Sequence, residues 1–378
     1  MKNVVTGISM VTCLGSDVNS VWDKICQAES GIGEISLFDT SNLRSSNAGQ
    51  VQEYDTNYVG SARMKAFAQM AIINAIKDSG LSTEEINNRK SILIIGTSLG
   101  HIFENENGPV QIDDYIDDIQ AELNLHIPYL SVSSACSSGT DAISIAADLI
   151  EYKDYEIVIC GGVDILDIYK MQGHSSLRTL ALDKCRPFTG TENKGTSLGE
   201  GAAFMVLESE DYCIKDNSER YAKLIASANT TDTESVTAPD ETGEGAKRMI
   251  ENALNRAKIN ADDIDYINAH GSGTPLNDRM EANIYNSYFK NDVVISSTKG
   301  AFGHSLGATG AIEAAISVMA IKNRQLPPTS GTEVMSKEWN NTKVLLNHCI
   351  SPKKAENYSL SVTYGFGGAN SCIIFSGV

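Results

Sequence analysis

The chain has 378 residues, of which 42% are hydrophobic and 21% are charged; this is the composition of a folded α/β protein rather than of a disordered or fibrous one. Its formal net charge of −18 gives a surface that repels phosphate backbones and anionic lipid headgroups, so we expect no nucleic-acid partner. No apolar run approaches the about 20 residues of a membrane-spanning helix, and no signal peptide or lipidation motif is visible, so we expect a cytoplasmic protein without membrane contact.

Short β-rich runs alternate with helical stretches along the whole chain. In the first half we predict, in chain order, a strand at 91–95, a helix at 141–152, and strands at 156–160 and 203–207. In the second half we predict a strand at 223–226, a helix at 244–258, a strand at 264–267, a helix at 308–322 and a strand at 358–362. The alternation indicates an α/β fold of two similar halves, with the polar stretch 208–219 as the seam between them.

The eight cysteines show neither paired CxxC motifs nor the density of a disulfide scaffold, so we expect reduced thiols. Most of them lie in apolar runs, where a cysteine is a small buried hydrophobe. Cys136 differs, because small residues surround it where a β-run gives way to a helix. A helix N-terminus favours the thiolate and lowers the pKa of a thiol, so Cys136 is the candidate nucleophile.

Two histidines lie in glycine-rich loops, the first of them directly after a predicted strand. His270 is followed by Gly271 and Gly273, and His304 is preceded by Gly303 in front of an Ala-rich helix. Loops of this kind often carry functional side chains. His101, His126, His174 and His348 have no such context, and we interpret them as surface or packing residues.

Other motifs are weaker. The G-x-S-x-G pattern of serine hydrolases and acyltransferases occurs three times, around Ser98, Ser197 and Ser305. In a glycine-rich chain such a short pattern arises easily by chance, so it is weak evidence, and a serine hydrolase stays as an alternative. The acidic run 111–118 lacks the glycine of a calcium-binding loop and is typical of a solvated helix face, so we predict no metal site.

Taken together, these residues make the chain resemble the β-ketoacyl-acyl carrier protein synthases, the ketosynthases of the thiolase superfamily, over nearly its whole length. The matching segments follow the order and approximate spacing of that family, and they lie at 4–10, 134–139, 186–188, 199–202, 268–271, 297–299, 303–304 and 365–370.

The resemblance implies a thiolase-like five-layer αβαβα sandwich built from two duplicated halves, 1–215 with the nucleophile and 216–378 with both histidines. It implies that Cys136 accepts the acyl group, with its own N–H and that of Phe366 as the oxyanion hole. His270 and His304 would stabilise the enolate formed when a malonyl group loses carbon dioxide.

The resemblance also assigns supporting residues. Lys299 and Glu313 match a structural ion pair of the family, in which the lysine supports the histidines rather than transferring protons. Phe366 matches a gating phenylalanine, Ser272 and Thr274 match two residues that contact the pantetheine or malonyl group, and Asp232 matches a polar residue behind the site.

No cofactor is implied, because the substrates are carried on the phosphopantetheine of an acyl carrier protein. Since carrier proteins are acidic, an enzyme of net charge −18 needs a local basic patch, and Arg63, Lys65 and Arg186 are the candidates by position.

Three questions stay open. The segment between Gly100 and Cys136 is shorter than is usual in the family and carries acidic residues at 113–122, which affects the acyl pocket and the dimer interface. The partner in a dimer is therefore either a second copy or an unlike, chain-length-factor-like subunit. A chain-length-factor-like chain itself usually lacks the nucleophile that Cys136 supplies here, and a module that only binds acyl chains would form no covalent adduct. The pathway, fatty acid or polyketide and polyene synthesis of type II, is not fixed.

Overall fold

The computed structural model describes residues 3–54, 58–102, 111–152, 154–189, 195–213, 220–289, 292–339, 342–354 and 357–378. The predicted boundary at 215/216 lies outside these described residues, and so do residues 214–219 of the predicted seam.

Eleven strands of the described residues form one mixed sheet in the order β11-β10-β9-β12-β13-β8-β1-β7-β6-β4-β5. Five of them come from the first half of the chain: β1 Asn3–Val11, β4 Ser91–Gly96, β5 Tyr129–Val132, β6 Ile157–Asp164 and β7 Gly201–Ser209. The others come from the second half: β8 Ala222–Thr231, β9 Tyr266–Asn268, β10 Val294–Ser296, β11 Lys343–Val344, β12 Tyr358–Tyr364 and β13 Ala369–Ser376. A separate hairpin-like pair joins β2 Gly33–Glu34 and β3 Asn47–Ala48.

The two halves repeat one topology. In each, the second strand runs parallel to the third and the fourth, the fourth pairs antiparallel with the fifth, and the fifth pairs antiparallel with the first. The first strands of the halves, β1 and β8, pair antiparallel and join the two units. β11 is an addition to the edge of the second unit. The duplication expected from the sequence is thus present in the strand order itself.

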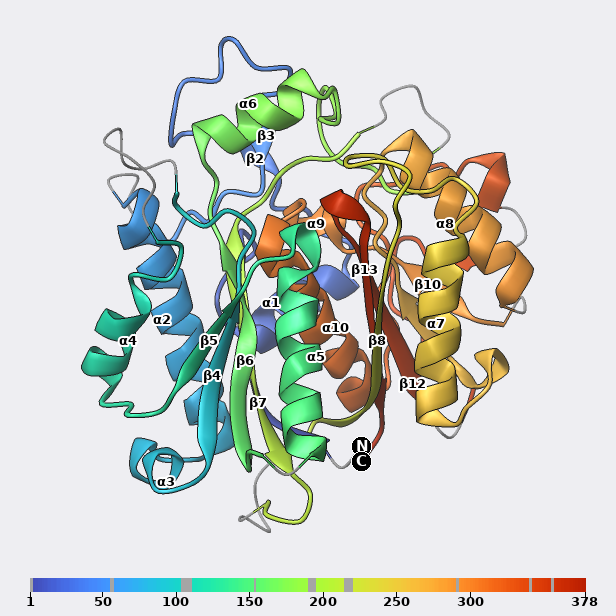
Figure 1. The fold of residues 1–378 in the computed structure, drawn as a ribbon. Helices are drawn as coiled ribbons and strands as arrows, with labels where there is room; N and C mark the ends of the chain where they lie inside the picture. The colour runs from blue at the N-terminus through green and yellow to red at the C-terminus, as the bar shows by residue number, and fades with distance from the viewer. Residues whose placement is uncertain are drawn as a thin grey trace.

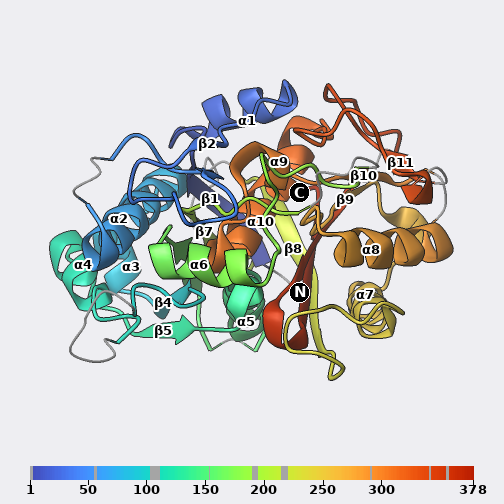
Figure 2. The ribbon, with the colours of Figure 1, turned by 90° about the horizontal axis from the view of Figure 1, so that it is seen from above.

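Helices occupy equivalent places in the two halves, as Figures 1 and 2 show. Two helices that follow the third strand, α5 Ser138–Glu151 and α10 Thr309–Asn323, pack against each other in the middle. The outer layers contain α2 Gly60–Ser79 and α4 Ile116–Leu123 on one side, and α7 Glu244–Ala257 and α8 Pro275–Tyr288 on the other. This gives the five layers of a thiolase-like αβαβα sandwich.

The remaining short elements lie around these layers. They are the helices α1 Val18–Cys26, α3 Thr83–Asn87, α6 Ile168–Ser176 and α9 Lys299–Phe302, and the 3₁₀ turns η1 Ala135–Ser137, η2 Ala261–Asp263, η3 Leu306–Ala308, η4 Lys337–Trp339 and η5 Phe366–Gly368.

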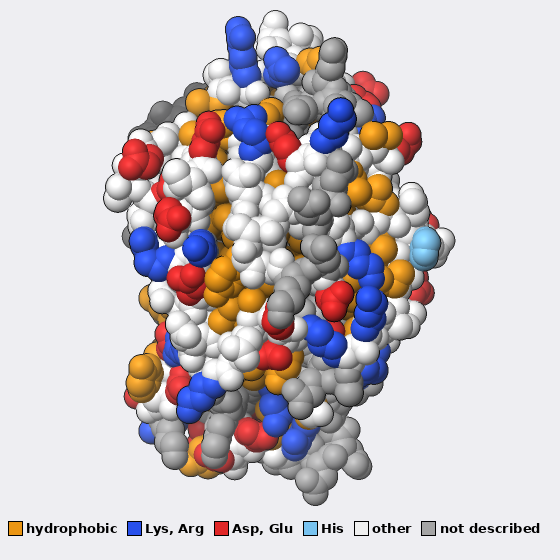
Figure 3. Space-filling view, turned by 90° about the vertical axis from the view of Figure 1, so that its right-hand side faces the viewer, with side chains coloured by type: hydrophobic (Ala, Val, Ile, Leu, Met, Phe, Trp, Pro, Cys, Tyr) orange, Lys and Arg blue, Asp and Glu red, His pale blue; other side chains and the backbone are white. Residues whose placement is uncertain are grey.

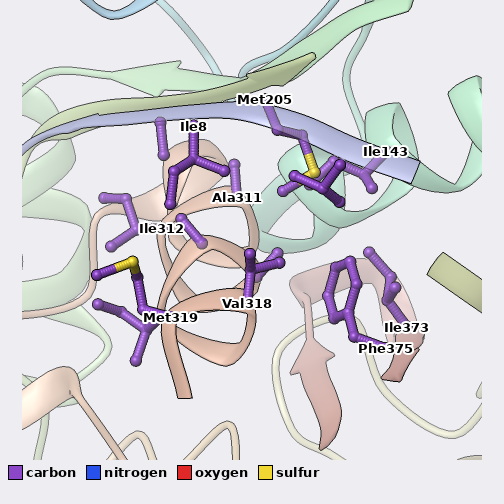
Figure 4. Packing of buried hydrophobic residues seen from close by; sticks show 14 of the residues in the cluster. Ile8, Ile143, Met205, Ala311, Ile312, Val318, Met319, Ile373 and Phe375 are labelled. Carbon is purple, nitrogen blue, oxygen red and sulfur yellow. The ribbon is translucent and has the colours of Figure 1, made fainter. Parts of the chain in front are cut away.

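Burial explains the composition of these helices. α7 turns one stripe inward, in which Ala246, Met249, Ile250 and Ala253 are buried at helical spacing. By contrast, the residues of α10 from Thr309 to Ile321 are buried all round, because the helix lies between both units. Figure 4 shows its Ala311, Ile312, Val318 and Met319 packed among residues of β1, α5, β7 and β13. The Ala-rich sequence before residue 322 therefore reflects close packing in the central layer.

One expectation about the cysteines is wrong. Cys26, the last residue of α1, forms a disulfide with Cys349, with 5.1 Å between their Cα atoms. The two residues are far apart in sequence, so nothing in their spacing indicated a pair. Cys13, Cys136, Cys160, Cys185, Cys213 and Cys372 carry free thiols. No helix in the described part of the chain is long and apolar enough to cross a membrane.

Candidate active site

The nucleophile candidate lies where the N-terminal unit meets the central layer. After β5, the chain turns through Ala135, whose φ of 55° is unusual for a residue with a side chain, and enters η1 and then α5. Such strained conformations cluster at functional sites. Cys136 lies in this turn and is 6% exposed. The predicted position of Cys136 at the start of a helix is present in the structure.

The predicted pKa direction of Cys136 is wrong. Burial raises the pKa of its thiol to about 11, and the Phe366 backbone N–H and the Lys299 charge, which both lower it, compensate only in part. A helix N-terminus lowers the pKa of a thiol, but the buried Cys136 side chain has lost its contact with water. The cost of desolvating the thiolate raises the pKa by more than the helix lowers it. The Cys136 side chain is therefore a thiol near pH 7.

His270 is held in one tautomer. It follows β9 directly, and the backbone N–H of Tyr364 donates to its Nδ1 at 3.3 Å. Since a backbone N–H is always a donor, Nδ1 accepts and the ring proton resides on Nε2. The next residue, Gly271, has a φ of 45°, and a Cβ there would lie 2.4 Å from the Cβ of Ser297. Only glycine fits this turn.

His304 is held in the same way. Its Nδ1 accepts from the backbone N–H of Leu306 at 3.1 Å and lies 2.9 Å from the hydroxyl of Thr309. Both contacts come from the turn η3 and the start of α10, so the helix N-terminus that follows the histidine also fixes its ring. The proton of His304 therefore lies on Nε2 as well.

The two imidazoles lie together, with 5.3 Å between ring centroids and an angle of 79° between their planes. Burial, together with the Lys299 charge, holds the pKa of each well below its ordinary value. Both rings are accordingly neutral near pH 7, and each offers an Nε2–H. Two preorganised donors of this kind stabilise negative charge that develops on an oxygen atom.

A buried ion pair supports this arrangement. Lys299 Nζ lies 2.6 Å from Glu313 Oε1 and donates to the carbonyl oxygen of His270 at 2.5 Å. Burial raises the pKa of Glu313 to about 7, although Lys299 lowers it. With its protons directed at a carboxylate and a backbone carbonyl, Lys299 anchors the His270 loop.

Glu281 was not predicted from the sequence. This buried residue of α8 accepts hydrogen bonds from the backbone N–H groups of His270 and Gly271 at 3.0 and 2.8 Å. Its carboxylate also accepts from the side chains of Asn277 at 2.6 Å and Tyr285 at 2.9 Å. One carboxylate thus fixes the backbone on which His270 is mounted. Its spacing from Asn277 and Tyr285, four residues on either side, was the available signal.

A pocket of about 250 Å³ contains Cys136, His270 and His304 in its wall. The predicted substrate-binding residues line the same pocket: Asp232, Ser272 and Thr274. The hydroxyls of Ser272 and Thr274 lie 2.9 Å apart. The structure therefore brings these three residues to the candidate nucleophile.

A second pocket, of about 460 Å³, meets the first at Cys136. The two share His174, Leu177 and Phe366. The rings of His174 and Phe366 are stacked, with 5.5 Å between centroids and 17° between planes. His174, which the sequence indicated as a surface or packing residue, packs on Phe366 and also lies at the junction of both pockets.

The three docking candidates differ. Arg63 is wrong as a docking residue: its side chain is 1% exposed and pairs with Glu200, with 2.5 Å between Nη2 and Oε1. It cannot meet another protein without unfolding. Lys65 lies at the surface and pairs with Asp118 and Glu122. Arg186 pairs with Asp183, and its side chain is 24% exposed.

The hydrolase alternative finds no support in the geometry. Ser98 donates to Asp164, and Ser197 Oγ accepts from the backbone N–H of Cys185 at 3.0 Å. Ser305 Oγ is buried without a hydrogen-bond partner in the part of the chain that the structure describes. None of these serines is paired with a histidine among the described residues. Those residues also contain no group of three or more metal-ligating side chains.

The fold and the Cys-His-His arrangement define the class of the protein, a thiolase-fold condensing enzyme. Comparison with known proteins gives the family. The model of the β-ketoacyl synthase N-terminal domain matches residues 2–212, and that of the C-terminal domain matches residues 221–333. The chain belongs to the β-ketoacyl synthase family, as its sequence motifs predicted.

Similar proteins extend over the whole chain. The 3-oxoacyl-[acyl-carrier-protein] synthase 2 of Vibrio cholerae is 30% identical over 407 aligned residues, which cover 98% of either chain. The solved ishigamide ketosynthase/chain length factor superposes with a TM-score of 0.89 at 24% identity, covering 100% of this chain and 99% of the other. A type II polyketide acyl-carrier protein in complex with its ketosynthase bound to the hexaketide gives a TM-score of 0.89 at 22% identity, with 100% and 99% covered.

Proposed function

We propose that this chain is a β-ketoacyl-acyl carrier protein synthase, which condenses an acyl group held on Cys136 with a malonyl group held on a carrier protein. The observation that carries the proposal is the geometry of the two imidazoles. Both present an Nε2–H in the pocket wall that also contains Cys136.

The first step is acyl transfer. The sulfur of Cys136 attacks the thioester carbonyl of the acyl carrier, and the pantetheine thiol leaves with the proton of the Cys136 thiol. The backbone N–H of Phe366 already reaches the Cys136 sulfur. With the N–H of Cys136 itself, it would form the oxyanion hole for the tetrahedral intermediate. Because the pKa of the thiol is about 11, proton loss accompanies the attack.

The second step makes the carbon–carbon bond. The malonyl group loses its carboxylate as carbon dioxide, and the electron pair moves into an enolate whose oxygen accepts from the Nε2–H groups of His270 and His304. The enolate carbon then attacks the Cys136 thioester, and the sulfur leaves as a thiolate, which takes a proton from water to restore the thiol. The product is a 3-oxoacyl group on the carrier, two carbons longer than the acyl group that entered. Phe366, between the pockets, would gate the two steps.

The test is intact-protein mass spectrometry after incubation with acyl carriers of several chain lengths. Wild type should gain the acyl mass, and Cys136→Ala should not. In a separate assay, carbon dioxide release from malonyl carrier should fall about 10²–10³-fold in His270→Ala and in His304→Ala, since each loses one oxyanion donor. An acyl mass that persists in Cys136→Ala would overturn the assignment of the nucleophile.

The carrier protein would deliver both substrates on its phosphopantetheine arm, so no resident cofactor is proposed. Arg178, an exposed residue in the wall of the first pocket, is placed to meet the acidic carrier at the mouth. Lys65 and Arg186 stay as further candidates. On the face of the C-terminal half that Figure 3 shows, Lys and Arg are interspersed with Asp and Glu, so that face offers no dense basic patch.

We further propose that the enzyme acts as a dimer through β5. This strand is one edge of the sheet, and its Tyr129 and Leu130 are 37% and 40% exposed. An edge with exposed apolar residues is a template for pairing with another chain. The partner is a second copy or a chain-length-factor-like subunit, and retention of Cys136, His270 and His304 makes this chain the active one of an unlike pair.

Light scattering on the purified chain tests the dimer. A homodimer should give twice the mass of 40.7 kDa, and Leu130→Lys should shift it toward the monomer. Tyr152→Lys, at an exposed residue after α5 and outside the edge strand, is the control that should leave the mass unchanged. A wild-type monomer would exclude a stable homodimer, and co-purification with an unlike ketosynthase-like chain would then support the heterodimer.

A further inference from the structure

The second pocket has a mixed wall. Apolar side chains of Leu99, Leu177, Leu306 and Phe366 line it together with polar ones, and α6 contributes several of the latter. The polar residues are Ser98, Ser133, Tyr169, Lys170 and His174. A pocket for a plain hydrocarbon chain would need none of them, and the hydrogen-bond partners of Ser98, Ser133, Lys170 and His174 show which of these four could serve a substrate.

The two serines are committed within the protein. Ser98 Oγ donates to Asp164 Oδ2, and Ser133 Oγ donates to the carbonyl oxygen of Ser98 at 2.6 Å. Each hydroxyl has a single proton, and that proton is used. The serines therefore have no donor left for a ligand.

Lys170 is committed as well. Its Nζ donates to Asp164 Oδ1 at 2.5 Å, to the carbonyl of Gly100 at 2.7 Å and to that of Ile165 at 3.0 Å. An ammonium group has three protons, so all of them are in use. Asp164 also accepts from the backbone N–H of Gly307 at 3.0 Å. The buried ion pair of Lys170 and Asp164 therefore has a structural role in the pocket wall and leaves no proton of Lys170 for a ligand.

His174 is different. Its Nδ1 lies 2.9 Å from Thr179 Oγ1, while Nε2 has no hydrogen-bond partner among the described residues. The face of the ring stacks on Phe366. Burial lowers the pKa of His174 to about 4, so the ring is neutral near pH 7. Thr179 Oγ1 donates its only proton to the carbonyl oxygen of His174 at 3.1 Å, so it accepts from Nδ1–H, and Nε2 carries the lone pair of an acceptor. The side chain thus brings one uncommitted ring nitrogen to the place where the two pockets meet Cys136.

We infer that His174 selects the acyl group, and that Nε2 accepts a hydrogen bond from a hydroxyl close to the thioester of the chain on Cys136. This deepens the proposed function and rests on it. A saturated chain leaves Nε2 unpaired in a pocket from which it displaces water, and an unpaired buried polar atom costs free energy. A chain with a hydroxyl at that point supplies the partner.

The experiment compares hexanoyl, 3-hydroxyhexanoyl and 3-oxohexanoyl carriers by the rate at which each acylates Cys136. Wild type should favour 3-hydroxyhexanoyl over hexanoyl by roughly tenfold, because its hydroxyl gains one neutral hydrogen bond to Nε2 and avoids leaving that nitrogen unpaired. Preference for the 3-oxohexanoyl chain would contradict the inference, since a keto oxygen cannot donate to Nε2.

Three variants separate recognition from packing. His174→Phe keeps a ring against Phe366 without a polar atom, and His174→Asn places an amide where Nδ1 meets Thr179 but none at Nε2; both should bring the rate ratio near one. His174→Gln, whose amide reaches the Nε2 position, should keep the preference. Circular dichroism and thermal unfolding of each variant report whether the fold is intact.

A wild type that acylates equally well with all three chains would overturn the inference, as would His174→Phe retaining the preference. Either result leaves Cys136 chemistry in place. If no carrier acylates wild type, the proposed function itself fails, and the selection by His174 fails with it.

Discussion

The proton on Cys136 decides how the enzyme can be inhibited as well as how it works. Papain-like nucleophiles hold a standing thiolate beside a charged histidine. Here both histidines near Cys136 are neutral, because burial and the Lys299 charge keep their pKa values low. A neutral imidazole cannot stabilise a thiolate by charge. The thiol is thus unreactive until a thioester is in place, which protects it from adventitious electrophiles.

Alkylation of Cys136 by iodoacetamide should therefore be slow near pH 7 and should rise about tenfold per pH unit up to about pH 9, where the thiolate fraction is still small. The sign follows from a pKa raised to about 11, since below that value each unit of pH multiplies the thiolate fraction by ten. Peptide-resolved mass spectrometry measures the rate. In denaturant, the same cysteine should level off near its ordinary pKa of about 8.5. A plateau already present near pH 7 in the folded protein would contradict the raised pKa.

The sequence predicted which residues lie together at the candidate site better than it predicted their protonation. Cys136 and His270 follow strands and His304 follows the short helix α9, and small residues or glycines mark the turns around all three. The pKa of Cys136 depends on how much protein covers it, which no local pattern records. The contact between His174 and Phe366 could not be predicted, because the two residues lie on different elements and are distant in sequence.

At the scale of elements, the loop after β9 is fastened from two directions. Lys299 at the start of α9 holds the carbonyl of His270, and Glu281 on α8 holds its N–H. Together these two contacts fix the position of the His270 ring relative to the His304 ring. The catalytic geometry is therefore set by α8 and α9 rather than by the loop's own sequence.

Glu281→Gln should lower the rate of malonyl decarboxylation more than the rate of Cys136 acylation. Gln can accept from one backbone N–H, but its own amide hydrogens would face the other donors, so about 1–3 kcal/mol of stability should be lost. Denaturant unfolding and carbon dioxide release are the two measurements.

Asn283→Ala is a matched control on α8, since this exposed residue lies outside the carboxylate's hydrogen-bond partners. It should change neither quantity measurably. Equal losses of acylation and decarboxylation in Glu281→Gln would point to general misfolding, and the positioning role of Glu281 would then be unsupported.

The same scale explains the error over Arg63. Arg63 and Lys65 looked alike as neighbouring cations, yet both lie on α2, and residues two apart on a helix face different ways. Arg63 points inward to Glu200, while Lys65 stays near the surface with Glu122. The sequence predicted β4, β6, β7, β8, β9 and β12 and both central helices, but it gave no strand for β1, β10, β11 or β13. It did not predict α2 either, so the faces of Arg63 and Lys65 could not be assigned.

At the scale of the whole molecule, the disulfide joins parts of the chain that pack behind the active site. Cys26 ends α1, and the chain that follows it lies against α9, where Gly31 N–H donates to the carbonyl of Ala301 at 2.8 Å. Ser30 Oγ donates to the carbonyl of Gly300 at 2.7 Å. Cys349 belongs to the C-terminal unit. The crosslink therefore fastens the first helix of one unit to the other, next to the element that begins with Lys299.

Replacing both cysteines, in a Cys26→Ser plus Cys349→Ser variant, should lower the free energy of unfolding by about 2–4 kcal/mol, because the bond closes a very long loop and restricts the unfolded chain. Denaturant unfolding of wild type with and without a reductant should show a shift in the same direction. The double variant should show no such shift, which separates the disulfide from other effects of the reductant.

Cytoplasmic thiols keep most protein disulfides reduced, so the crosslink would form in the cell only where the surroundings are oxidising. Titration of free thiols in denaturant without reductant decides the matter directly: six thiols confirm the bond, and all eight cysteines of the sequence would show that it does not form.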